Sequence, residues 1–86
     1  MNIDEAIRRA DQRMKNDIPA ETKKRWLDGL QAAVNAERHD ATPIPADVGE
    51  AYLVMRYALE TDNLNRYNIW AGIFNARVTG FIARGR

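Results

Sequence analysis

Apolar residues recur at the spacing of an α-helix along almost the whole chain of 86 residues, and no stretch shows the alternation of a half-buried β-strand. Only five glycines and three prolines interrupt this pattern. Helices tend to end before a proline, because proline disfavours the helical conformation of its predecessor. The sequence therefore predicts an all-α fold with four helices, over residues 3–16, 20–37, 46–60 and 63–83.

Short polar connections separate the predicted helices. Pro19 suits the first position of the second helix, where its missing N–H has no partner to lose. Residues 39–47 form the main linker, and residues 42–45 within it contain two prolines and are not expected to be helical. Residues 61–63 make a tight turn in which Asp62 is expected to cap the last helix. Helices joined so closely are expected to pack as an antiparallel hairpin. We predict one helical domain over residues 1–86.

Composition excludes several classes of protein. A chain of this length holds one domain, because a second would be too small to bury a core. The absence of cysteine excludes disulfides and thiolate–zinc sites. The longest uncharged aliphatic stretch, residues 69–76, is too short to cross a membrane, and charges near the N-terminus argue against a signal peptide. A net charge of +1 argues against binding to duplex DNA by bulk electrostatics.

The last predicted helix carries three stripes at helical spacing. Its aromatic and aliphatic residues fill an arc of roughly 120°, the usual width of a core-facing stripe. Arg66, Arg77 and Arg84 follow a second line, and Ile69 and Ile73 lie just beyond it. The third stripe is a polar and small face that consists of Asn68, Gly72, Asn75 and Thr79. Together with apolar residues of the two preceding helices, this pattern predicts a core of Trp26, Leu27, Leu30, Tyr52, Met55, Tyr67, Trp70, Phe74, Val78 and Phe81.

Ile69 and Ile73 fall outside the core arc, and a domain of this size has one core. Either a neighbouring helix covers them, or they are tolerated at the surface, or they form a contact between subunits. Residues 63–86 carry four arginines and no acidic residue, so the preceding 62 residues carry −3. This asymmetry fits an acidic partner or passing DNA, although cations near a helix C-terminus also interact well with the helix dipole.

Catalytic residues are not apparent. His39 is the only histidine and lies in a polar linker. The carboxylate pairs Asp47/Glu50 and Glu60/Asp62 resemble cap and surface residues, and the glycines are scattered singly rather than in a phosphate-binding loop. We therefore expect no enzymatic activity, no cofactor and no metal site.

Two stretches resemble a known family. Residues 23–30, Lys-Lys-Arg-Trp-Leu-Asp-Gly-Leu, and the run Asn65-Arg66-Tyr67-Asn68 followed by Phe74-Asn75-Ala76 are similar to the small head–tail connector proteins of phages, also called head-completion or adaptor proteins. Pro45-x-Asp47 and Tyr52-Leu53 are similar to parts of the family's penultimate helix. The chain departs from the family where Pro19 replaces a serine cap, where Ala46 replaces an aromatic residue, and in its shorter linker.

The resemblance implies a structural virion protein that forms a ring, usually dodecameric, below the portal. Such a ring extends the DNA channel and provides the surface for tail attachment. The implied partners are other copies of the chain, the portal protein, the next head–tail or tail component, and DNA that passes without sequence recognition; no membrane is involved. The implied location is the head–tail junction of the virion, after assembly in the cytoplasm of the bacterial host.

A ring requires contacts between subunits, and the last helix supplies most of the candidates. The residues expected at this interface are Arg66, Ile69, Ile73, Arg77, Asn68 and Asn75, with Glu50 and Glu60 as receivers for the arginines. The alternative function is a small DNA-binding regulatory protein, whose second and third helices would form a helix-turn-helix. The proline-containing linker between those helices argues against that alternative.

Overall fold

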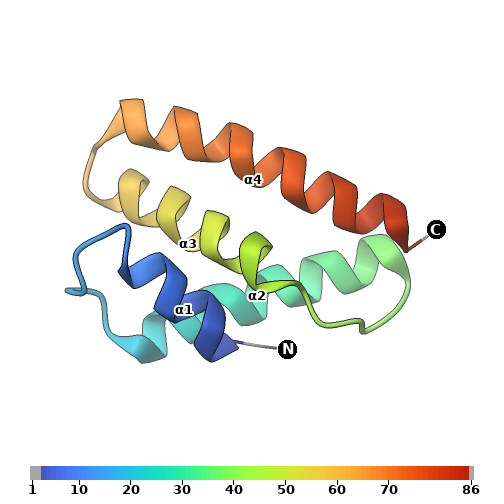
Figure 1. Cartoon of the computed structure of the whole chain (residues 1–86). Helices are drawn as coiled ribbons and strands as arrows, with labels where there is room; N and C mark the ends of the chain where they lie inside the picture. Colours follow the sequence, from blue (N-terminus) through green and yellow to red (C-terminus); the bar gives the residue numbers. More distant parts are fainter. Residues whose placement is uncertain (1–2, 86) are drawn as a thin grey trace.

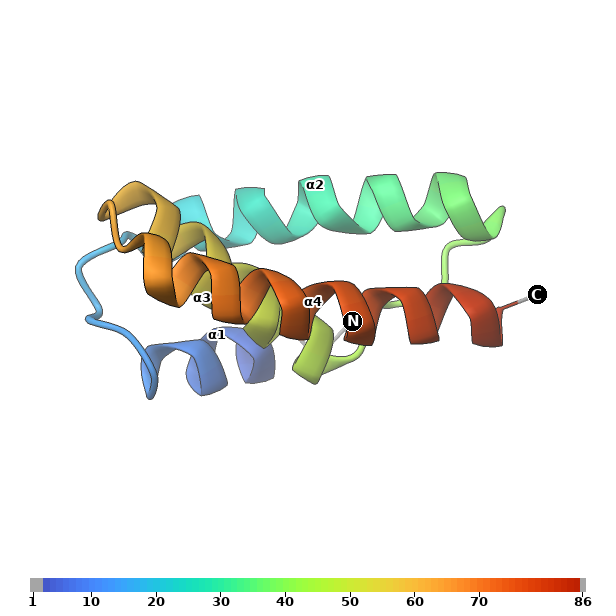
Figure 2. The ribbon, with the colours of Figure 1, turned by 90° about the horizontal axis from the view of Figure 1, so that it is seen from above.

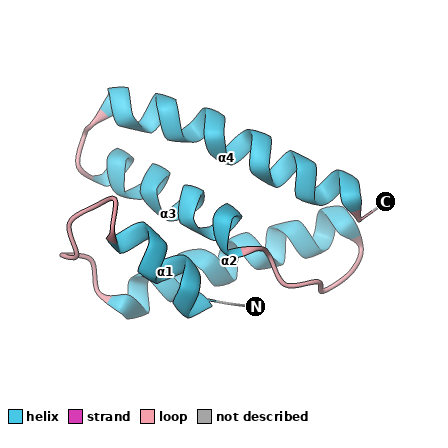
Figure 3. Cartoon of the chain, in the orientation of Figure 1, coloured by secondary structure: helices cyan, strands magenta, loops and turns pink. Residues whose placement is uncertain are grey.

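The computed structural model describes residues 3–85, and this part of the chain contains four helices and no strand (Figures 1 and 3). They are α1 (Ile3–Asp11), α2 (Ala20–Arg38), α3 (Ala46–Glu60) and α4 (Leu64–Arg84). The predicted all-α fold is confirmed. The bounds of α2, α3 and α4 differ from the predicted ones by at most one residue.

Helix α3 forms the centre of the fold. It packs mainly against α4 and α1, and α2 makes less extensive contacts with all three other helices. Figure 1 shows α4 returning beside α3 after the turn at residues 61–63, while Figure 2 shows α2 and α4 running in the same direction. More than half of the residues of α3 are buried, so α3 has little surface of its own.

The tightest packing lies where α1 and α2 meet α3. A Cβ at Gly49 would lie 2.8 Å from the Cβ of Ala6 and 3.3 Å from a methyl of Leu27, so only glycine allows this approach. The hydrophobic core extends from this point through all four helices. Its buried members are Ala6, Ala10, Met14, Leu27, Leu30, Val34, Ile44, Val48, Leu53, Val54, Tyr57 and Phe81.

The predicted core residues divide into two groups. Leu27, Leu30 and Phe81 are buried. The others are half-buried: Trp26, Tyr52, Trp70, Phe74 and Val78 pack against the core from its edge, and Met55 and Tyr67 lie farther out. Four of the half-buried residues belong to α4, which lies on the outside of α3; among the residues of α4 only Phe81 is buried.

Helix α1 is shorter than predicted: it ends at Asp11, whereas the prediction extends it to residue 16. The Nζ of Lys23 donates to the side chains of Asp11 and Asn16, at 2.8 Å each, and Arg13 turns toward Glu50 on α3. These bonds to distant parts of the chain fix residues 12–19 as a loop. Met14 is buried although it lies outside the helix.

The helix starts also differ in detail from the prediction. Asn63 caps α4, since its side-chain oxygen accepts a hydrogen bond from the backbone N–H of Arg66 at 3.2 Å. Asp62, the expected cap, has a left-handed backbone with φ 56° and forms the turn instead. Pro19 is the residue just before α2, and its carbonyl accepts the first backbone bonds of that helix.

Candidate interaction surface

The side of α4 that is turned away from α3 is the most unusual surface of the molecule. Six exposed residues follow one another there at alternating spacings of four and three, which places them on one side of the helix. We call this stripe the α4 outer face; it consists of Asn65, Ile69, Gly72, Ala76, Thr79 and Ala83. None of the six is charged, although the stripe covers five turns of an exposed helix.

The two isoleucines that lie outside the predicted core arc differ in exposure. Ile69 is 63% exposed, and no other part of residues 3–85 covers it. Ile73 lies at the edge of α4 and is half-buried. Leu64 and Leu59, at the two ends of the turn between α3 and α4, are also exposed. Asn68 and Asn75 lie on the opposite edge of the α4 outer face, and both are exposed.

Arg77 and Glu50, both expected at a subunit interface, bind each other within one protomer. Nη1 of Arg77 donates to Oε1 of Glu50 at 3.2 Å and to the backbone oxygen of Asp47 at 2.8 Å. Nε of Arg13 donates to the other carboxylate oxygen of Glu50 at 2.7 Å. The side chain of Glu50 is buried, so it is not open to an arginine from a neighbouring copy. A buried carboxylate needs such partners, because leaving it unpaired is costly.

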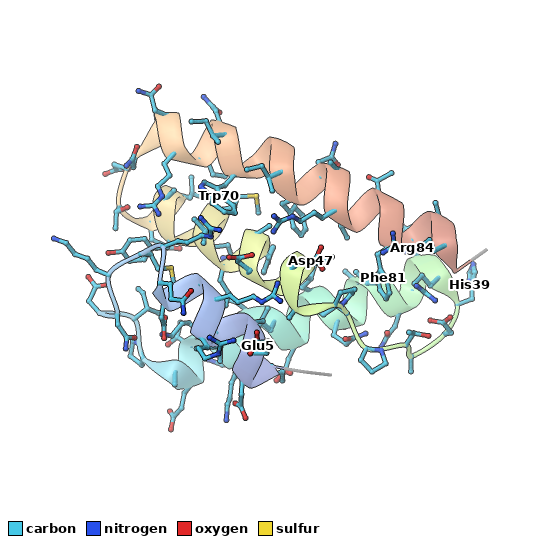
Figure 4. The ribbon with its side chains drawn as sticks, in the orientation of Figure 1. Glu5, His39, Asp47, Trp70, Phe81 and Arg84 are labelled. Atoms are coloured by element: carbon cyan, nitrogen blue, oxygen red, sulfur yellow. The ribbon has the colours of Figure 1, made fainter. Side chains whose placement is uncertain are left out.

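This ionic cluster joins three parts of the chain. The guanidinium of Arg13 lies 5.3 Å from the ring of Trp70, so the loop after α1 contacts α4 as well as α3. Figure 4 shows Trp70 and Asp47 on the sides of α4 and α3 that are turned toward each other. The cluster therefore holds the N-terminal loop, α3 and α4 in a single arrangement.

The remaining charged interface candidates are Arg66 and Glu60, and Arg84, which was not a candidate, lies on the same helix as Arg66. The side chains of Arg66 and Arg84 form no hydrogen bond or ion pair with the residues that the structure describes. Figure 4 shows Arg84 at the C-terminal end of α4. Glu60 lies 3.9 Å from Arg56 on the same helix, a weak and exposed pair. Arg66 and Arg84 are thus available for another molecule.

An aromatic cluster lies between α2, α3 and α4 at the edge of the core. The guanidinium of Arg56 lies 4.6 Å from the ring of Trp26 and 5.9 Å from that of Tyr52. The rings of Tyr52 and Phe74 are 5.2 Å apart. Trp26 of α2 and Phe74 of α4 thus each pack against a side chain of α3 at the edge of the core, where both are half-buried.

Sequence reasoning missed both buried charges, Glu50, which it placed at the surface, and Lys23. Lys23 is 1% exposed, and its ammonium group binds Asp11 and Asn16. The signal was present, because Lys23 lies four residues before Leu27 and seven before Leu30, on the buried side of α2. A lysine at such a position needs an acidic partner, and the sequence does not show which one.

Residues 3–85 contain no group of three or more side chains that could hold a metal ion. His39 is exposed and ends α2 with a left-handed backbone. A surface hollow between the ends of α2 and α4 is lined by Glu37, Thr79, Ile82 and Ala83. None of the described helices is both long enough and apolar enough to span a bilayer.

Comparison of the chain with protein-family models, with curated proteins and with solved structures gives no match. The function is therefore argued from the residues of this chain.

Proposed function

We propose that the chain is a structural virion protein, a phage head–tail connector that assembles into a ring below the portal. One observation carries the proposal: the α4 outer face exposes an uncharged stripe with Ile69 at 63% exposure. A soluble helix normally places charged residues on its outer side. An exposed face without them is typical of a contact between proteins.

The sequence motifs support the same function. The Arg-Tyr-Asn triplet and the Phe-Asn pair that resemble the connector family lie on α4, the helix that carries the exposed face. In the proposed ring, copies of the chain extend the DNA channel and present a surface to the next head–tail or tail component. This role needs positioning and no chemistry. The near-neutral net charge suits DNA that passes without being held.

The test is assembly on the portal. Purified protein is mixed with portal-bearing heads that lack a connector, and bound protein is measured by sedimentation and seen by negative-stain microscopy. We expect a ring at the portal vertex and, after its addition, attachment of the tail component. Ile69→Asp should abolish ring formation, because it places a charge on the apolar part of the α4 outer face.

Leu59→Asp is the matched control, since Leu59 is also exposed but lies on α3, away from the α4 outer face. This variant should assemble like the unchanged protein. A chain that remains monomeric and leaves the heads unoccupied at every concentration would refute the proposal.

The alternative, a DNA-binding regulatory protein, fits these residues less well. The helix that would read the bases is α3, and its fully exposed residues are Leu59 and Glu60. A recognition helix contacts base edges in the major groove through its first turns. Leu59 and Glu60 lie at the other end of α3, and neither is a common partner of base edges. Duplex affinity that falls steeply with salt concentration would favour this alternative over the ring.

A further inference from the structure

Both charged residues that are buried in the described part of the chain bind one short segment. They are Lys23 on α2, which is 1% exposed, and Glu50 on α3, which is 5% exposed. Lys23 binds Asp11 and Asn16, and Glu50 binds Arg13. All three partners lie at the end of α1 or just after it. The buried charges of two helices therefore converge on the same stretch of chain.

The hydroxyl of Tyr57 on α3 is a third buried polar group that binds this stretch. Tyr57 is 7% exposed, and its hydroxyl hydrogen-bonds to the carboxylate of Asp17 and accepts from the backbone N–H of Lys15. Residues 11–17 thus receive polar bonds from three buried side chains. We call residues 3–17, which comprise α1 and this polar stretch, the N-terminal strap.

The N-terminal strap contributes few large side chains to the core. Its buried apolar members are two alanines, Ala6 and Ala10, together with Met14, and Ile3 and Ile7 pack against the core from its edge. A helix of nine residues is too short to be stable alone in water, so α1 exists only while it is docked. Polar bonds supply much of the attachment, and water can replace such bonds when the strap leaves.

The packing of α2, α3 and α4 has contacts of its own. The rings of Tyr52 on α3 and Phe74 on α4 are 5.2 Å apart, and Arg38 on α2 donates to the backbone oxygen of Phe81 on α4 at 2.9 Å. None of these contacts involves the N-terminal strap. Among the described helices, α1 packs only against α3 and α2, and Figure 1 shows α1 and α4 on different sides of α3.

Opening of the N-terminal strap leaves no charge both buried and unpaired. Glu50 loses Arg13 but keeps Arg77, whose Nη1 donates to it at 3.2 Å. Lys23 loses both of its partners, but these belong to the strap, so their departure opens the ammonium group to water. The ring of Trp70, which lies 5.3 Å from Arg13, is only half-buried before opening. The large penalty for leaving a buried charge unpaired therefore does not oppose this motion.

We propose that the N-terminal strap is a detachable cover, which leaves α2 and α3 as one unit while α2, α3 and α4 stay folded. The chain then has a closed and an open state, and the open state uncovers the side of α2 and α3 that carries Lys23, Glu50 and Tyr57. Such partial openings lie between the native and the unfolded state in free energy. The proposal is independent of the proposed ring, because it concerns a single protomer.

Amide hydrogen exchange under native conditions, followed by NMR, tests this inference. Exchange of the α1 amides reports opening of the strap, and exchange of the slowest α3 amides reports unfolding of the whole chain. We expect a lower opening free energy for α1 than for α3. We also expect the α1 value to fall less steeply with added denaturant, because opening of the strap exposes less surface than global unfolding.

Phe81→Leu separates the strap from the rest of the fold. Phe81 is buried on α4, which α1 does not contact, so the change weakens packing that the closed and open states share. It should accelerate exchange of the slowest α3 amides about tenfold and leave the α1 amides unchanged. Equal acceleration in α1 and α3 would overturn the inference, because it would show that the chain opens only as one cooperative unit.

Asn16→Ala is the corresponding change within the strap. It removes one partner of Lys23 from the closed state alone, so the α1 amides and the slowest α3 amides should both exchange about fivefold faster. Gln12→Ala, at an exposed position of the same segment, should change neither. Faster exchange in α3 without a change in α1 would contradict a strap that opens through this contact.

Limited digestion with trypsin shows whether the rest of the chain stays folded without the strap. Lys15 lies within the strap, and cleavage after it requires the open state. We expect an early product that begins at residue 16 and keeps its helical circular dichroism. Its formation should be faster for Asn16→Ala and unchanged for Phe81→Leu. Digestion to small peptides without this product would refute a detachable strap.

Discussion

At the scale of single residues, the buried charges decide how the N-terminal segment is held. Lys23 and Glu50 are almost fully buried, and each has two partners from other parts of the chain. Burial of a charge costs several kcal/mol unless partners compensate for the lost water. The segment that contains Asp11, Arg13 and Asn16 therefore has one favourable position.

Asp11→Ala tests the role of Lys23. Without this carboxylate the buried ammonium keeps only Asn16 as a partner, so we expect the free energy of unfolding to fall by about 3 kcal/mol. Denaturant unfolding measures the change. Asp4→Ala, at an exposed position of the same helix, should have little effect. Recovery of stability in Asp11→Ala/Lys23→Met would show that the unpaired charge causes the loss. Equal stability of Asp11→Ala and the control Asp4→Ala would contradict the prediction.

Tyr57 gives the chain a pH dependence on the alkaline side. Burial raises the pKa of the Tyr57 hydroxyl, and the neighbouring Asp17 carboxylate adds to this shift. Since the neutral phenol is favoured in the fold, its contribution to stability is complete below the unfolded pKa of about 10 and is lost as the pH rises through the higher folded pKa.

We therefore expect the free energy of unfolding to fall with pH above about 10, with a shallower fall in Tyr57→Phe. Absorbance of the phenolate should show one of the three tyrosines ionising late, and Tyr57→Phe should remove that late step. A late step that persists in this variant would assign it to Tyr52 or Tyr67 instead.

At the scale of helices, the C-terminal end of α4 is fixed against the end of α2. Nη1 of Arg38 donates to the backbone oxygen of Phe81 at 2.9 Å, and the same guanidinium lies 4.2 Å from the Phe81 ring. A Cβ at Gly85 would lie 2.5 Å from this guanidinium, so the end of α4 fits closely around Arg38. Phe74 lies about two helical turns before Phe81 on α4 and is only half-buried.

The difference between these two aromatic residues of α4 predicts a difference in stability. Phe81→Ala should cost about 3–5 kcal/mol, because it empties a buried site. Phe74→Ala should cost less, because part of its ring already contacts water. Denaturant unfolding of both variants measures the two costs. A larger loss for Phe74→Ala would show that α4 is held at the contact with Tyr52 instead of at its end.

At the scale of the whole molecule, arginines on one helix have separate tasks. Arg77 is bound to α3 through Glu50 and Asp47, whereas Arg66 has no ion-pair partner in the described chain. One stripe of like charges in the sequence therefore contributes both to the fold of a protomer and, in the proposed ring, to its contact with a neighbour.

Arg77→Ala and Arg66→Ala should accordingly separate folding from assembly. We expect Arg77→Ala to lower Tm by roughly 5 °C or more, because it leaves a buried carboxylate with one partner fewer. Arg66→Ala should leave Tm nearly unchanged and weaken assembly. Calorimetry and sedimentation measure the two quantities, and a drop in Tm for Arg66→Ala equal to that for Arg77→Ala would refute the separation.

Local signals in the sequence accounted for most of the helices. Pro19 and Pro45 stand directly before α2 and α3, where a missing N–H costs nothing, and the polar turn at residues 61–63 separates α3 from α4. The helical repeat also placed Ile69 off the core arc of α4. Such features depend on neighbours within one or two turns, so they can be read from the order of residues.

Packing between distant segments settled the rest. The end of α1 depends on Lys23, Glu50 finds Arg77 27 residues away, and α3 rather than α4 occupies the centre of the core. These outcomes depend on which helices meet and how closely, for example through the small Gly49 beside Ala6. The periodicity of a single helix shows which residues share a side, but the neighbours that cover that side are chosen by the three-dimensional packing of the whole chain.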